Sequence, residues 1–316
     1  MNPRIFVSLA SYQDPMLMFT LNDAVAKAAY PERLRFGVVD QHAADQRAQI
    51  AALPFGALVR YVHLDPQDTL GVCWARALGF SLYDGEDFLL QVDSHTLFEP
   101  RWDEQLLAQH AALRSRCAKP IISTYPYRFD LVDGQPVHAP QEDRTVLVLR
   151  PHPDTTLSAD DLVLRFQGRH LFTDGPVRGC HIAGGFVFCA GRFVEEVPYD
   201  PYLYFHGEEQ SLSVRAFTRG WDIYHPLHIP LYHLYKQANV AHAEHHWHGA
   251  VDARRAFSSA YLTERAKLRL KRLLTGQEVG TPYGLGTQRS LAAFAQLSGI
   301  DYLARSIRDC WDGRLA

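Results

Sequence analysis

The chain has 316 residues, of which 47% are hydrophobic and 21% are charged. These fractions are ordinary for a globular protein and exclude a largely disordered chain, and the length suffices for a large α/β domain with an appended segment. The formal net charge of −3 argues against broad nucleic-acid binding, which needs a basic surface, but it leaves room for a nucleotide in a local pocket.

The first 95 residues alternate between strand-like and helix-like segments. Short apolar runs predict strands, and segments with helical spacing that end near a proline or glycine predict helices. The strands are expected at residues 4–11, 33–41, 57–65 and 87–95, and the helices at 16–29, 44–53 and 70–84. This alternation is typical of parallel strands joined by right-handed crossovers, so we predict an α/β fold with a mostly parallel central sheet.

The remainder of the chain is less regular. Residues 131–176 are rich in Pro, Asp and Gly, which predicts long loops, with a hairpin as one option around the strand-like piece at 144–151. Further strands are expected at 120–130, at 181–191 with a glycine pair inside it, and twice within 222–235. Helices are expected at 208–220, 251–274 and 287–297, the last capped by Thr287. We expect residues 1–250 to form the catalytic domain and 251–316 a helical extension packed on it.

The cysteines and the apolar runs bear on the compartment. The five cysteines are an odd number without C-x-x-C spacing, which argues against a disulfide framework or zinc ribbon and favours a reducing compartment. The first apolar run is too short for a signal peptide, and no stretch approaches the roughly 20 apolar residues of a membrane span. We therefore expect a cytoplasmic protein with no integral membrane segment.

Polar residues follow three of the predicted parallel strands. They are Ser8, Ser11 and Tyr12 on the first strand, Asp40 and Gln41 on the second, and Asp93, Ser94 and His95 on the fourth. Ligands of such sheets bind beyond the carboxyl ends of the strands, so these residues predict the rim of a pocket.

Asp93 and His95 are two residues apart, and alternate residues of a strand share a face, so both side chains can reach one point. A carboxylate and an imidazole suit a divalent metal, Mn²⁺ in particular. A cation there could neutralise a diphosphate leaving group. An isolated D-x-H pattern is more often a pair of surface residues, but its place at the end of the fourth strand favours a metal site.

Eight segments of the chain, in their order, resemble one family of enzymes. The segments are "VSLASYQDP", "GVVDQ", "GVCWAR", "LYDGEDFLLQVDSHTLFEPRWD", "AGGFVFCAG", "VPYDPYLYFHGEEQSLSVRAFTRGWDIYHP", "YHLY" and "LGTQRSLAAFAQLSGIDY". Together they resemble the GlcNAc-transferase family of cytosolic protist enzymes that glycosylate a hydroxyproline on a ubiquitin-ligase subunit, a family with bacterial homologues. The resemblance runs from about residue 4 to 303. It implies a GT-A fold, a UDP-GlcNAc donor, a divalent metal and transfer with retained α configuration.

The resemblance also suggests roles for residues elsewhere in the chain. His233 in "YHLY" is the candidate third metal ligand beside Asp93 and His95; the alternative is a hydrogen-bonded histidine in a tyrosine-rich strand. Glu208 and Glu209 open a helix, where acids are favoured by the helix dipole, and we expect at least one, with Glu208 preferred, to act in catalysis. The residues expected to bind the donor are Ser8, Ser11, Tyr12, Asp40, Gln41, Arg76, Gly184 and Gly185. For the glycine pair the alternative is a β-bulge.

Three other features have a structural interpretation as well as a functional one. The cluster from His242 to His248 contains His245 and His246 as well, and it is interpreted as surface histidines, a loop that binds phosphate or acceptor, or a second zinc site. The basic helix within 264–274 is interpreted as a solvated face with an aliphatic stripe, rather than as a docking surface for an acidic partner or membrane. Trp102 is interpreted as a core tryptophan, and for Asp103 the structural alternative is a helix-start acid.

The resemblance, together with the D-x-H pattern, therefore implies a glycosyltransferase that uses Mn²⁺ or Mg²⁺ and a UDP-sugar donor, and that acts on a hydroxyl of a protein or glycan. Two alternatives stay open at this point: a metal-dependent hydrolase that uses the histidines, and a non-catalytic relative that binds a sugar nucleotide.

Overall fold

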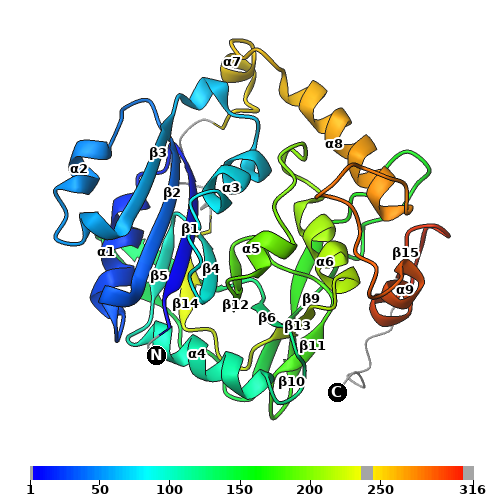
Figure 1. Cartoon of the computed structure of the whole chain (residues 1–316), viewed down its shortest axis with the longest axis horizontal. Coiled ribbons are helices and arrows are strands. Elements are labelled where there is room, and N and C mark those ends of the chain that lie inside the picture. The colour runs from blue at the N-terminus through cyan, green and yellow to red at the C-terminus, as the bar shows by residue number, and fades with distance from the viewer. Residues whose placement is uncertain (1–2, 236–244, 309–316) are drawn as a thin grey trace.

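The structure is a computed structural model that describes residues 3–235 and 245–308. Within these residues a central sheet of eight strands runs through the molecule (Figure 1). Across the sheet the strands are β11 (Val177–Gly179), β13 (Asp222–His225), β6 (Pro120–Ser123), β12 (Phe186–Ala190), β4 (Phe88–Asp93), β1 (Ile5–Tyr12), β2 (Leu34–Gln41) and β3 (Val59–Leu64). The pairs β1–β2, β1–β4, β2–β3 and β6–β13 are parallel. The pairs β4–β12, β6–β12 and β11–β13 are antiparallel. The sheet is thus mostly parallel, as predicted.

A second sheet begins directly after β4. Its order is β5 (Thr96–Phe98), β14 (Leu231–His233), β7 (Tyr127–Val132) and β8 (Gln135–His138). Two smaller antiparallel pairs join β9 (Thr145–Pro151) to β10 (Phe166–Phe172) and β15 (Ile300–Asp301) to β16 (Ser306–Ile307). Because only two residues separate β4 from β5, the carboxyl edge of the central sheet and the start of the second sheet meet at one corner.

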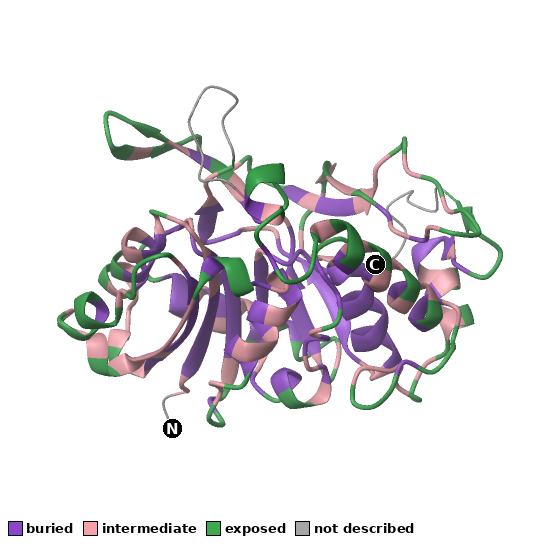
Figure 2. Cartoon of the chain, turned by 90° about the horizontal axis from the view of Figure 1, so that it is seen from above, coloured by how far each residue is buried: buried purple, intermediate pink, exposed green. Residues whose placement is uncertain are grey.

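Helices cover both faces of the central sheet. They are α1 (Leu17–Lys27), α2 (Arg47–Ala51), α3 (Val72–Phe80), α4 (Trp102–Leu113), α5 (Phe193–Glu196), α6 (Glu208–Thr218), α7 (Gly249–Asp252), α8 (Ser259–Leu274) and α9 (Leu291–Ser298), with short 3₁₀ turns at Pro31–Arg33, Gly56–Leu58 and Pro66–Asp68. One apolar cluster joins the sheet to α1 and α4, and another joins it to α3, α5, α6, α8 and α9. Figure 2 shows the strands as the buried interior between these layers.

In the N-terminal half the predicted elements are confirmed, with one difference that concerns the site. β4 ends at Asp93, so Ser94 and His95 form a bend and do not continue the strand. The bend is held because the Thr96 hydroxyl donates to the Asp93 carbonyl at 2.8 Å and the Thr20 hydroxyl donates to the Ser94 carbonyl at 2.8 Å. The expectation that Asp93 and His95 share a strand face was therefore wrong, although the two side chains do meet.

The strand expected at 120–130 is two strands in different sheets, β6 and β7. Pro126 lies between them and lacks the amide hydrogen that a continuing ladder would need. The expected strand at 181–191 begins only at Phe186, after the glycine pair, which lies in a tight turn bridged by Ala183 and Phe186.

The segment 131–176 contains more strand than expected. β7 and β8 form a hairpin across Asp133 and Gly134, whose φ angles of 50° and 76° suit a tight two-residue turn. β9 and β10 form the pair that the sequence left as an option.

The C-terminal helices also differ from the expectation. The helix expected at 251–274 is divided into α7 and α8 by turns at residues 253–258, and the Ser258 side chain caps α8 by accepting from the Tyr261 amide at 3.2 Å. The cap of α9 is Ser290 in place of Thr287; its hydroxyl accepts from the Ala293 amide at 3.1 Å. The buried residues of α8 and α9 join the same apolar cluster as α6, and the basic positions of α8 surround that aliphatic stripe. The division at residue 250 stays a prediction.

Trp102 has the structural role that was preferred for it, and Asp103 connects two helices. Trp102 is fully buried and its Nε1 donates to the Ala24 carbonyl at 2.9 Å. The Asp103 carboxylate accepts from the amides of Ala29 and Tyr30 at 2.7 and 2.9 Å, which ties α4 to the end of α1.

Two expectations concern the helices and the cysteines among the described residues. None of the helices there has both the length and the apolarity to span a membrane. Cys73, Cys117 and Cys189 are free thiols, and Cys310 lies outside the described residues.

Candidate functional site

Asp93, His95 and His233 come together where the two sheets meet. Asp93 ends β4, His95 precedes β5, and His233 ends β14, whose pairing with Thr96 places it beside His95. One ligand atom from each residue lies within 4.8 Å of the other two. Within residues 3–235 and 245–308, no other group of three His, Cys, Asp or Glu side chains is close enough to hold one metal ion. The three residues predicted as metal ligands thus form one cluster, although they come from segments that are 140 residues apart.

The charges around the cluster keep Asp93 ionised. Burial opposes the charge, but the hydrogen bond from His233 Nε2 at 3.1 Å and the Arg76 guanidinium, whose Nη2 lies 2.6 Å from Oδ1, hold the pKa of Asp93 well below its usual range. The two histidines face each other, with 2.9 Å between their Nε2 atoms. An ionised carboxylate and two imidazoles that converge on one point are a suitable donor set for a divalent transition metal.

A further carboxylate, that of Asp14, contacts His95 on the ring nitrogen that faces away from His233. Asp14, in the turn between β1 and α1, lies with its Oδ2 2.6 Å from His95 Nδ1, and the same oxygen accepts from the Ser94 hydroxyl at 2.5 Å. Burial opposes ionisation of Asp14, but its hydrogen bond and charge interaction with His95 lower the pKa of this carboxyl. Sequence reasoning missed Asp14, although it lies in the quoted segment "VSLASYQDP".

Arg76 links the cluster to Glu208. Its side chain is 6% exposed, and Nη1 contacts Glu208 Oε1 while Nη2 contacts Asp93. The Tyr199 hydroxyl donates to the same Glu208 oxygen at 2.8 Å, and Gln91 Nε2 donates to the Tyr199 hydroxyl at 2.6 Å. Arg76 was predicted to contact the donor; in this structure its guanidinium is held between two carboxylates, so contact with the donor stays a prediction.

Glu209 differs from Glu208 in its partners and in its access to solvent. Its Oε1 accepts from the Gly184 amide at 2.9 Å and its Oε2 from the Tyr125 hydroxyl at 3.0 Å. Burial, followed by the nearby Glu208 charge, raises the pKa of Glu209 to about 7. Glu209 is half-buried whereas Glu208 is buried, so of the two predicted catalytic acids Glu209 is the more accessible.

The glycine pair packs against these same groups. A Cβ at Gly184 would lie 2.5 Å from Arg76 Nη1, and one at Gly185 would lie 2.7 Å from Asp93 Oδ2. Only glycine fits beside these two charged side chains without displacing them. The pair therefore belongs to the wall of the cluster, and its contact with a donor sugar stays a prediction.

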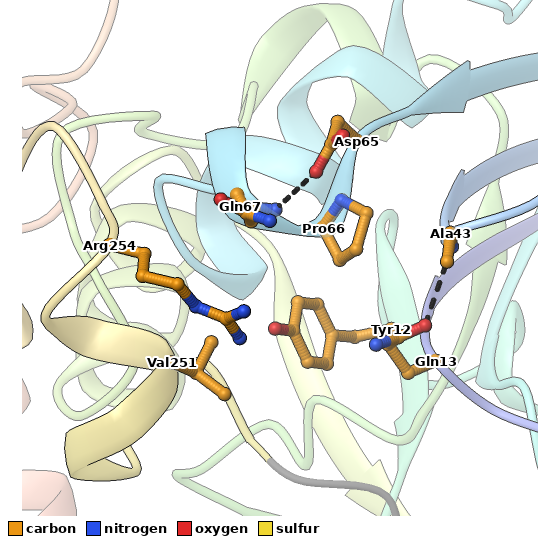
Figure 3. Close-up of a pocket in the computed structure, with 8 residues that line it drawn as sticks. All are labelled: Tyr12, Gln13, Ala43, Asp65, Pro66, Gln67, Val251 and Arg254. Atoms are coloured by element: carbon orange, nitrogen blue, oxygen red, sulfur yellow. Dashed lines mark hydrogen bonds between the residues drawn. The ribbon is translucent and has the colours of Figure 1, made fainter.

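A pocket of about 210 Å³ opens at the carboxyl ends of β1, β2 and β3. Its lining residues are Tyr12, Gln13, Ala43, Asp65, Pro66, Gln67, Val251 and Arg254. Figure 3 shows the Arg254 side chain, which follows α7, pointing toward the Tyr12 ring. Tyr12 and Asp93 belong to paired strands, since Ala10 of β1 lies opposite Asp93, so the pocket and the cluster of Asp93, His95 and His233 share one edge of the sheet.

The other residues predicted to contact the nucleotide do not line this pocket. Ser8 was expected at the strand end, but β1 continues to Tyr12, and the Ser8 hydroxyl faces Gly79 of α3 in mid-strand, so that expected position was wrong. Ser11, Asp40 and Gln41 do end their strands but are buried. Asp40 accepts from the Tyr61 hydroxyl at 2.9 Å, and Gln41 contacts the Ser11 carbonyl and the Thr69 hydroxyl. These contacts brace the pocket wall.

Residues 245–255 form one side of the pocket, which Val251 and Arg254 line. His246 is buried, with its ring 4.9 Å from the Tyr12 ring and its Nδ1 2.5 Å from the Tyr204 hydroxyl. Burial, followed by the Arg255 charge, lowers the pKa of His246 to about 3, so this imidazole is neutral. Arg255 anchors the segment by donating to the Thr69 carbonyl at 2.5 Å and the His246 carbonyl at 3.1 Å.

This segment bears on the histidine cluster. His242 lies outside the described residues, and residues 245–248 are not helical. In the described part of the chain, His245, His246 and His248 belong to no group of three potential metal ligands. The packing of His246 on Tyr12 was not among the interpretations of the cluster and could not be inferred from local sequence.

The chain is similar to known glycosyltransferases. A family model described as "Glycosyltransferase (GlcNAc)" matches residues 4–55 and 45–304, which is nearly the whole chain. No curated protein matches the chain. The crystal structure of GalNAc-T7 with UDP, GalNAc and Mn²⁺ is similar with a TM-score of 0.59 and 16% sequence identity, over 94% of this chain and 55% of that chain.

A second solved structure, Staphylococcus aureus TarS 1–349 in complex with UDP-GlcNAc, matches with a TM-score of 0.49 and 15% identity, over 96% of this chain and 72% of that chain. The similarity to GalNAc-T7 shows the shared fold and confirms the predicted GT-A architecture. The chain spans little more than half the length of that protein, since the match covers 55% of it.

Proposed function

Because the chain belongs to the GlcNAc glycosyltransferase family, we propose that it transfers N-acetylglucosamine from UDP-GlcNAc to a hydroxyl group of a protein or glycan, in a reaction that needs Mn²⁺. The observation that carries this proposal is the cluster of Asp93, His95 and His233 on the same sheet edge as the pocket lined by Tyr12. The structurally similar GalNAc-T7 was crystallised with UDP, GalNAc and Mn²⁺, which supports the same kinds of ligand here.

The donor set of the cluster fits a divalent ion and favours Mn²⁺ over Mg²⁺. Asp93, His95 and His233 would hold the ion, and two imidazoles among three ligands suit a transition metal better than Mg²⁺, which prefers oxygen. When bound, the ion would supply positive charge next to the diphosphate leaving group. Arg76 holds one Asp93 oxygen and thereby orients that carboxylate.

We propose that the uridine end of the donor occupies the pocket lined by Tyr12, Pro66 and Arg254. The Tyr12 ring offers an apolar face to the base, and the Arg254 guanidinium, which is exposed at the pocket, offers hydrogen-bond donors to the oxygen atoms of the uridine. The pocket is smaller than a whole nucleotide sugar needs, so the diphosphate and sugar would extend from it toward the cluster.

Of the two carboxylates at the start of α6, we propose different roles. Glu208 is held by Arg76 and Tyr199 and positions Arg76 against Asp93. Glu209 is more accessible, and its carboxylate accepts a hydrogen bond from the Gly184 amide. We propose that it faces the reacting sugar and stabilises the positive charge that develops there. Retention of the α configuration is supported by the family resemblance, and no protein nucleophile is assigned.

Thermal unfolding with combinations of ligands tests the proposed function. With UDP and Mn²⁺ each at about 100 times its Kd, the unfolding midpoint should rise by roughly 8 °C, because each bound ligand stabilises the folded chain. Mn²⁺ alone or UDP alone should give a clearly smaller rise. A response to the metal without any response to UDP would favour a metal-dependent hydrolase instead, and no response to either would contradict the proposal.

A further inference from the structure

Asp14 occupies the turn that connects the nucleotide pocket to the metal cluster. It directly follows Gln13, which lines the pocket, and its side chain is 13% exposed. Oδ1 accepts from the Met16 amide at 2.8 Å, which fixes the carboxylate within its own turn. Oδ2 is then aimed at Ser94 and His95, which come 80 and 81 residues later in the chain.

The contact with Asp14 determines which nitrogen of His95 carries the proton. An ionised carboxylate only accepts hydrogen bonds, so at 2.6 Å His95 Nδ1 must be the donor. In the neutral imidazole Nε2 then keeps its lone pair, and Nε2 is the atom that lies 2.9 Å from His233 Nε2. The Ser94 hydroxyl, 2.5 Å from the same Asp14 oxygen, holds the carboxylate in place from the neighbouring residue.

His233 has no such partner on its second nitrogen. Its Nε2 lies 3.1 Å from Asp93 Oδ2 and 2.9 Å from His95 Nε2, which makes Nε2 the donor, and its Nδ1 is buried without a hydrogen-bond partner among the described residues. The two histidines therefore differ in whether the Nε2 atom that faces the cluster carries a proton. His95 already presents a lone pair there, whereas His233 presents an N–H.

We propose that Asp14 is a positioning residue that fixes His95 in the tautomer whose Nε2 binds Mn²⁺. The inference rests on the proposed metal site, and it follows the general rule that a histidine ligand donates its other N–H to a carboxylate or carbonyl that orients the ring. Since Asp14 adjoins Tyr12 and Gln13, the same turn carries a wall of the nucleotide pocket and the support of a metal ligand.

Titration of free Mn²⁺, followed by electron paramagnetic resonance, tests this without any turnover. Asp14→Ala should weaken Mn²⁺ binding by about 10- to 100-fold. Asp14→Asn should lose less, since its amide oxygen can still accept from His95 Nδ1. The matched control is Asp154→Ala, which removes an exposed carboxylate 3.5 Å from the Nδ1 of His152, outside the cluster, and should leave the affinity unchanged.

A second readout would not respond to a merely structural role. Long-range ¹H–¹⁵N spectra of the metal-free wild type should show His95 protonated on Nδ1, and Asp14→Ala should lose that preference. A wild-type His95 protonated on Nε2, or equal Mn²⁺ affinity in wild type and both Asp14 variants, would overturn the inference while leaving the metal site intact. If Asp93→Ala binds Mn²⁺ as tightly as the wild type, the metal site itself fails, and this inference with it.

Discussion

Replacing Asp93 by alanine should lower the rate of sugar transfer by about three orders of magnitude, which corresponds to about 4 kcal/mol of transition-state stabilisation. Asp93 is the anionic member of the ligand cluster, held in place by Arg76 and His233. Without it the site would lose the charge that retains the cation, and the departing diphosphate would lose the electrostatic stabilisation that a metal supplies. Steady-state transfer from UDP-GlcNAc with saturating Mn²⁺ measures the loss.

Two comparisons protect this result from a trivial explanation. Asp93→Asn keeps the volume of the side chain and removes only its charge, so a similar loss in this variant excludes a packing effect. Asp84→Ala removes a carboxylate whose side chain is 81% exposed, and it should leave the rate unchanged. An Asp93→Ala variant that retains a third or more of the wild-type rate would be incompatible with a metal-dependent mechanism at this corner.

Glu209→Gln should lower the rate of transfer by about 100-fold and, at the same time, stabilise the protein at alkaline pH. The kinetic loss is expected because removal of one well-placed electrostatic group from an active site costs about 10²- to 10³-fold. The substitution fits the site, since the Gln carbonyl can still accept from the Gly184 amide. The matched variant Glu264→Gln replaces an acid that is 76% exposed and should change neither property.

The stability effect of Glu209→Gln follows from the raised pKa of this carboxyl, which is about 7 in the folded protein against 4.5 in the unfolded chain. A raised carboxyl pKa means that the protonated form favours folding fully below about pH 4.5, and that this contribution is lost as the pH rises through 7. Glutamine stays neutral, so relative to the wild type it should gain about 3 kcal/mol between pH 4.5 and pH 8.

Urea unfolding of the metal-free protein at several pH values measures this difference. A difference between Glu209→Gln and wild type that does not change with pH would show that Glu209 ionises at its ordinary pKa. If the transfer rate were also unaffected, Glu209 would have no place in the reaction, and Glu208 would be the carboxylate to examine.

The first four strands and the polar edge they form could be predicted because each is a local pattern. Apolar runs with helical segments between them define β1 to β4, and the parallel topology brings the ends of β1, β2 and β4 to one edge. His233 was predicted through the resemblance alone. Its position beside His95 depends on the pairing of β14 with β5, a long-range register for which the sequence holds no local signal.

The two acids of α6 show the limit of sequence reasoning most clearly. Glu208 and Glu209 are adjacent and both occupy the first helical turn, so pattern and dipole treat them alike. Packing separates them, because one meets Arg76 and Tyr199 and the other meets the Gly184 amide and Tyr125. Asp14 was missed for a related reason, since its partner His95 is 81 residues away.

Ser8 was misplaced because it was grouped with Ser11 and Tyr12, although it lies well before the end of β1, whose bounds were predicted to within one residue. The pairing of β1 with β2 continues to Tyr12 opposite Gln41, which leaves Ser8 in mid-strand against Gly79. The sequence does contain a signal for the break between β6 and β7, which is Pro126, and one for the start of α8, which is Ser258. They were outweighed by the hydrophobic periodicity of the longer segments around them.

Anomalous diffraction at the manganese edge, from crystals grown with Mn²⁺ and UDP, shows whether the metal and the nucleotide bind at this edge of the sheet. One manganese ion should be bound by Asp93, His95 and His233, with the diphosphate beside it and the uridine in the pocket lined by Tyr12 and Arg254. Manganese bound at other residues, or UDP bound away from this edge of the sheet, would contradict it.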